Sequence, residues 1–100
     1  MNNEQLRDLL IENYDYKESQ VDSVIERINN FDPKVRASFN NWLETGKLDD
    51  IEVEGYTIAN IIELQKPIKV VSAYIALDWL TKDAKEAKKA LHTKRSGTPL

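Results

Sequence analysis

The sequence predicts an all-α protein, a single compact domain of five or six helices with one short extended segment at residues 48–55. Apolar side chains recur at the spacing of one helical face through most of the 100 residues, and a period of two appears only in that segment. Three Gly and three Pro residues, with 41% hydrophobic and 31% charged residues, exclude collagen-like and wholly disordered chains.

Two amphipathic helices are expected over residues 3–13 and 18–29. Their apolar residues follow the three- and four-residue spacing of a helical face. These are Leu6, Leu9 and Leu10 in the first range, with Tyr14 directly after it, and Val21, Val24, Ile25 and Ile28 in the second. The polar residues around Asp15 separate the two helices.

A third helix is expected over residues 33–45. Asp32 is a strong N-cap acceptor, and Pro33 at the first helical position gives up an N–H that has no intrahelical partner. Gly46 supplies the left-handed residue that ends the helix.

Residues 48–55 follow a different pattern. Three acidic residues alternate with Ile51 and Val53, which is the period of an extended chain. No second strand is apparent in the sequence, so we expect this segment to form no sheet. It should instead lie along the helices with Ile51 and Val53 inward, and Gly55 should reverse its direction.

Two short helices are expected over residues 58–65 and 83–92. Thr57 is placed to cap the first of them. Asp83, with Glu86 three residues later, resembles a capping box at the start of the second.

The helix expected over residues 67–80 is the predicted centre of the fold. Pro67 is suited to open it, and its apolar residues, Trp79 among them, leave no wide polar face. A buried carboxylate on this helix, Asp78, must be paired, hydrogen-bonded or shifted in its pKa. We expect a structural pairing with Lys82 or with a tyrosine hydroxyl, and a functional site centred on Asp78 is the alternative.

Residues 1–95 are expected to form one helical domain, because no repeat and no long linker divides them. This domain would have an N-terminal three-helix half (1–46) and a C-terminal helical half (57–92), with a frayed tail at 96–100. The longest apolar run is far shorter than the ~20 residues that cross a bilayer, and no leader is visible. We therefore expect a cytoplasmic protein with no membrane contact.

Residues that could carry catalysis or bind a metal are few. The chain has no Cys, so thiolate metal sites and Cys nucleophiles are excluded, and His92 is the only histidine. The acidic stretch 50–55 resembles the first half of a calcium loop, but Ile61 stands where that loop needs a bidentate Glu. We expect no catalytic residue, no cofactor and no metal.

The first 45 residues or so resemble ubiquitin-associated three-helix modules in size. Two expected helices are joined by a turn that contains Tyr14 and Tyr16, and a third helix follows. Those modules carry a Met-Gly-Phe or Met-Gly-Tyr loop after the first helix, whereas residues 13–16 contain neither Met nor Gly. No binding residue is therefore transferred from the family.

The net charge of −3 hides an uneven distribution. Residues 1–81 carry eight basic and fifteen acidic side chains, a balance of −7, and residues 82–95 have a balance of +4. The leading expectation is a non-catalytic intracellular interaction or accessory module that binds an unidentified protein or a second copy of itself. The alternative is weak binding of nucleic acid or an acidic partner, and the acidic remainder of the chain disfavours nucleic acid. The candidate surface for this alternative is the basic C-terminal helix with Lys85, Lys88, Lys89, Lys94 and Arg95.

Overall fold

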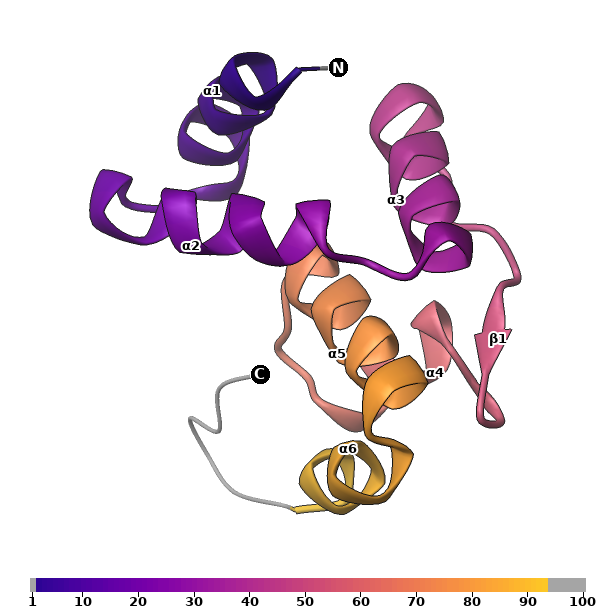
Figure 1. The fold of residues 1–100 in the computed structure, drawn as a ribbon. Coiled ribbons are helices and arrows are strands. Elements are labelled where there is room, and N and C mark those ends of the chain that lie inside the picture. Colours follow the sequence, from indigo (N-terminus) through magenta and orange to yellow (C-terminus); the bar gives the residue numbers. More distant parts are fainter. Residues whose placement is uncertain (1, 94–100) are drawn as a thin grey trace. The chain divides into compact units, whose positions relative to one another are not determined.

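The computed structural model describes residues 2–93, which contain six helices and one two-stranded sheet (Figure 1). The all-α prediction is therefore confirmed, whereas the tail predicted at 96–100 lies outside the described residues. In chain order the elements are α1 (Asn3–Tyr14), α2 (Glu18–Asn29), α3 (Pro33–Thr45), β1 (Glu52–Val53), β2 (Tyr56–Thr57), α4 (Ile58–Leu64), α5 (Val70–Lys82) and α6 (Ala84–Leu91). None of these helices has both the length and the apolar character that crossing a bilayer requires.

The described residues divide into two compact units, the first ending at Asn30 and the second beginning at Phe31. In the first unit, α1 and α2 pack against each other. Asp15, with a left-handed φ of 59°, ends α1 and makes the turn between them, which Asp tolerates better than most residues. Because α3 groups with the second unit, residues 1–45 do not form a separate three-helix module.

In the second unit, α3, α4 and α6 begin or end at the capping residues that the sequence predicts. Asp32 and Thr57 cap α3 and α4 by accepting hydrogen bonds from the backbone N–H groups of Lys34 and Asn60. Asp83 likewise accepts from the N–H of Glu86 at the start of α6. Gly46 ends α3 with a φ of 74°. Each cap satisfies a backbone group that the helix itself leaves unpaired.

Helix α5 is central to the second unit, as predicted, because it contacts α3, α4, α6 and β1. Its start differs from the prediction. Lys69 has an extended backbone with φ −76° and ψ 147°, so α5 begins at Val70 instead of Pro67. Trp79 is only partly buried, which makes its predicted core position wrong. It lies two helical turns after Ser72, on a side of α5 that is partly exposed.

The prediction that residues 48–55 form no sheet is wrong. Strand β1 pairs with β2 in an antiparallel hairpin, with Val53 opposite Tyr56. Glu54 and Gly55 connect the strands with φ values of 52° and 85°, the left-handed pair that a tight two-residue hairpin turn requires. The second strand is only two residues long, so it leaves no periodic pattern in the sequence.

Leu77→Ala tests the central position of α5. Leu77 has no exposed surface, so its truncation should cost about 2–5 kcal/mol of unfolding free energy through lost burial and a residual cavity. Leu64→Ala is the matched control, because Leu64 is 42% exposed and its truncation should change stability by about 0.5 kcal/mol or less. Urea denaturation followed by circular dichroism measures both. Equal losses in the two variants would contradict the burial of α5.

Candidate functional site

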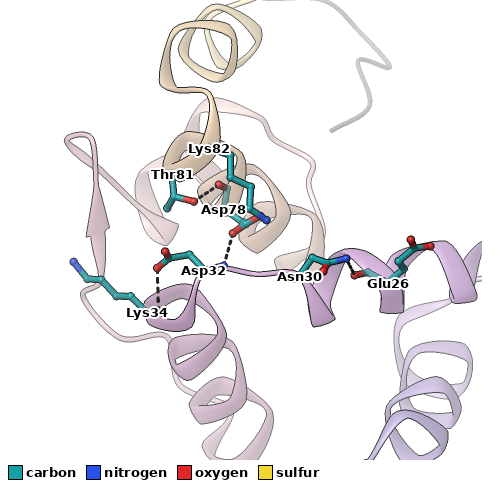
Figure 2. Close-up of polar contacts among 7 residues, drawn as sticks. All are labelled: Glu26, Asn30, Asp32, Lys34, Asp78, Thr81 and Lys82. Atoms are coloured by element: carbon teal, nitrogen blue, oxygen red, sulfur yellow. Dashed lines mark hydrogen bonds and ion pairs between the residues drawn. The ribbon is translucent and has the colours of Figure 1, made fainter.

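Asp78 is the buried acidic side chain that the sequence singled out, and its carboxylate points from α5 toward the chain just before α3 (Figure 2). Oδ1 accepts a hydrogen bond from the backbone N–H of Asp32 at 2.7 Å. Oδ2 lies 2.8 Å from Nζ of Lys82. The predicted pairing with Lys82 is confirmed. The contact with Asp32 was missed, because nothing local in the sequence links positions 46 residues apart.

The partners of Asp78 give it a role in holding α3 against α5. The backbone N–H of Asp32 donates to the Asp78 carboxylate. The side chain of Asp32 is also the N-cap of α3, because it accepts a hydrogen bond from the N–H of Lys34 at 3.1 Å. The backbone carbonyl of Asp78 also accepts a hydrogen bond from the Thr81 hydroxyl at 2.6 Å. Hydrogen bonds to an ionised group contribute about 1.5–3 kcal/mol each. Because Asp32 and Lys82 each contact one carboxylate oxygen of Asp78, both of these oxygens have a partner within the fold.

A second polar cluster joins Ser38 on α3, Tyr74 on α5 and Asp49 in the segment after α3. The buried Ser38 hydroxyl donates a hydrogen bond to the Asp49 carboxylate. Because that proton is engaged, the Tyr74 phenol donates to Ser38, with its oxygen 2.9 Å from Oγ and 3.3 Å from the carbonyl oxygen. This cluster was not predicted from the sequence. Its one local signal is that Ser38 falls on the apolar stripe of α3 between Val35 and Trp42.

The environment of Tyr74 favours its neutral phenol. Burial raises the pKa of Tyr74, the hydrogen bond with Ser38 lowers it, and the negative charge of Asp49 raises it further. The net shift is upward from the ordinary value of 10.0. Aromatic rings enclose the phenol, with the Phe39 centroid 5.4 Å and the Trp42 centroid 6.2 Å from that of Tyr74. Tyr74 is therefore a hydrogen-bond donor at neutral pH.

Raising the pH above 10 should destabilise the protein through Tyr74. The folded state retains the phenol proton above pH 10.0, where the unfolded chain releases it. The unfolded state then binds fewer protons, so the free energy of unfolding falls with rising pH, and below pH 10 the stabilisation is complete. Urea denaturation on both sides of pH 10 measures this fall. The Tyr74→Phe variant should show a smaller fall, and an equal fall in both proteins would contradict the assignment.

The basic C-terminal helix is the third candidate. Lys85 and Lys89 are exposed one turn apart on α6. Lys88 is partly buried, and its Nζ lies 3.4 Å from a carboxylate oxygen of Glu54 in the hairpin turn. Lys94 and Arg95 lie outside the described residues. The structure thus brings Lys85 and Lys89 together and places Lys88 beside an acid.

The hairpin makes a second contact at the end of α6. The Tyr56 hydroxyl is hydrogen-bonded to Nε2 of His92, which is exposed. The side chain of Gln65 also donates to the carbonyl of Leu91 in the last turn of α6. These contacts attach the last turn of α6 to the hairpin and to the end of α4.

Comparisons with known proteins give no functional information. No family model matches the chain, and neither a curated protein nor a solved structure matches it. Among residues 2–93, no three His, Cys, Asp or Glu side chains are grouped so that they could hold a metal ion. The three polar clusters described above are therefore the basis for inferring a function.

Proposed function

We propose that the protein is a non-catalytic interaction or accessory module that acts in the cytoplasm and binds a protein partner. The pairing of Asp78 is the observation that supports this proposal. Asp32 and Lys82 contact both of its carboxylate oxygens. A catalytic acid or base needs an oxygen that can form a hydrogen bond with the substrate, so these contacts argue against a catalytic role for Asp78. Ser38, which is also polar and buried, is likewise engaged on both sides.

The absence of Cys supports the cytoplasmic part of the proposal, because the fold does not depend on an oxidising compartment. A second copy of the chain is one partner that the proposal allows. Sedimentation velocity over a range of concentrations tests for a homodimer.

A thermal-shift titration with Mg²⁺, Mn²⁺ and Zn²⁺ tests the proposal against a metal-dependent enzyme centred on Asp78. A metal held with micromolar affinity and present at about a thousandfold excess over its Kd would add about 4 kcal/mol of stability. We expect no saturable rise in Tm with any of the three metals. The Asp78→Asn variant should have a lower Tm than the wild type at every metal concentration, because its contacts with Asp32 and Lys82 are weakened. A saturable rise in the wild type that Asp78→Asn abolishes would favour the enzyme.

A second candidate function is weak binding of an acidic partner through α6. It is favoured by Lys85 and Lys89, which are exposed on one side of the helix while Glu54 partly neutralises Lys88. Exposed cations of this kind attract an anionic surface, and the attraction weakens as salt screens it. Two such cations support only a weak contact.

Fluorescence anisotropy with a labelled acidic peptide, at low and at moderate salt, tests this second candidate. We expect weak binding at low salt that is lost at moderate salt. Replacing Lys85 and Lys89 by Ala should abolish it. Replacing Lys47 and Lys66 by Ala removes the same charge from other exposed positions and should leave binding nearly unchanged. Equal losses in the two double variants would show that net charge, and not the α6 surface, attracts the peptide. A labelled DNA duplex serves as the comparison probe, and its tighter binding would exclude the acidic-peptide assignment.

A further inference from the structure

The segment that connects α3 to β1 is held by very few contacts. Residues 48–51 have no regular secondary structure, and the first three of them are exposed. Outside the strand pairing of the hairpin, their backbone groups form no hydrogen bond within the described part of the chain, and the Asp49 carboxylate makes the segment's one polar contact with a helix. Ile51 adds a partly buried side chain.

Both ends of this segment are fixed. At one end, the N–H of Gly46 donates to the carbonyl of Trp42 at 2.7 Å and closes α3. At the other end, β1 is paired with β2, and Nζ of Lys34 lies 3.3 Å from the Glu52 carbonyl oxygen. Movement of the segment is therefore confined to the few residues between the two anchors.

The one polar contact connects an exposed group to a buried one. Asp49 is exposed, whereas Ser38 is 4% exposed and Tyr74 has no exposed surface. The hydrogen bonds run from the Tyr74 phenol to Ser38 and from the Ser38 hydroxyl to Asp49. If the segment moved away, water would replace the Asp49 carboxylate as the acceptor for Ser38, so the buried hydroxyl would not be left unpaired.

We propose that residues 48–51 are a strap that Asp49 latches onto Ser38, and that the strap opens reversibly to expose the Ser38 hydroxyl and the Tyr74 phenol. Opening breaks one charge-assisted hydrogen bond and exposes the partly buried side chain of Ile51, and it leaves the helices and the hairpin intact. Local openings that break few contacts occur far more often than global unfolding. This inference is independent of the proposed function, because it concerns access to the Ser38–Tyr74 pair and not the identity of a partner.

Limited trypsin digestion measures the opening, because Lys47 places a cleavage site immediately before the strap. When opening is fast relative to cleavage, the cleavage rate reports the population of the open state. Ser38→Ala and Asp49→Ala should each raise the rate of cleavage after Lys47 by about tenfold or more, the value expected for losing a hydrogen bond to a charged group. Asp50→Ala is the matched control, since it removes the same charge from the same strap and no latch contact. It should leave the rate nearly unchanged.

The cleavage rate after Arg36, within α3, separates strap opening from general destabilisation. Mass spectrometry of the first products gives both rates in one digest. We expect the rate after Arg36 to stay near that of the wild type while the rate after Lys47 rises. An equal rise at both sites, or equal rates in Asp49→Ala and Asp50→Ala, would overturn the proposal.

Two further variants test whether Ser38 and Asp49 act as one latch. The double variant Ser38→Ala/Asp49→Ala should be cleaved after Lys47 no faster than the faster single variant, because both changes remove the same hydrogen bond. Asp49→Asn keeps an acceptor oxygen without the charge and should be cleaved at a rate between those of the wild type and Asp49→Ala. Multiplying effects in the double variant would show two separate contacts and would overturn the latch.

Discussion

The burial of α5 is the constraint on which the rest of the second unit depends. A buried helix leaves its polar side chains no water to bind, so each needs a partner from a neighbouring element. Two such side chains, Tyr74 and Asp78, lie one turn apart on α5, and both find their partners in or beside α3. The Asp78 carboxylate accepts a hydrogen bond from the backbone N–H of Asp32 just before α3 begins, and the Tyr74 phenol donates one to Ser38 within α3. These two attachments fix the position of α3 along α5 and allow the aromatic ring of Phe39 to pack edge-on against Tyr74.

The helices of this protein could be predicted because their ends depend on residues two to four positions apart. The caps at Asp32, Gly46, Thr57 and Asp83 are local signals, and all four end or begin a helix as expected. The central place of α5 was also predictable, since a helix without a polar face must be buried. The pairing of Asp78 with Lys82 could be predicted for the same reason, because the two residues are one helical turn apart.

The features that were missed depend on contacts between distant positions or on very short elements. Ser38 and Tyr74 are 36 residues apart, and their contact requires the packing of α3 on α5, which no local pattern encodes. The hairpin has strands of only two residues, too short for an alternating pattern to appear. Its turn does carry a signal in Gly55, which was interpreted as a reversal without a partner strand. Trp79 was misplaced because a helix that is apolar all round does not indicate which of its sides remains partly exposed.

The charge distribution of the second unit limits how strongly α6 can attract an anion. The acidic hairpin turn lies against the same helix that carries the lysines, so Glu54 offsets Lys88, and both groups are partly exposed, where ion pairs contribute little to stability. Lys85 and Lys89, the exposed cations on α6 within residues 2–93, would release few counterions from a nucleic acid, which gives a shallow dependence on salt and a low affinity. Stable binding by this surface therefore requires additional contact area beyond the two lysines. An acidic protein surface that also covers neighbouring apolar side chains supplies that area more readily than a phosphate backbone does.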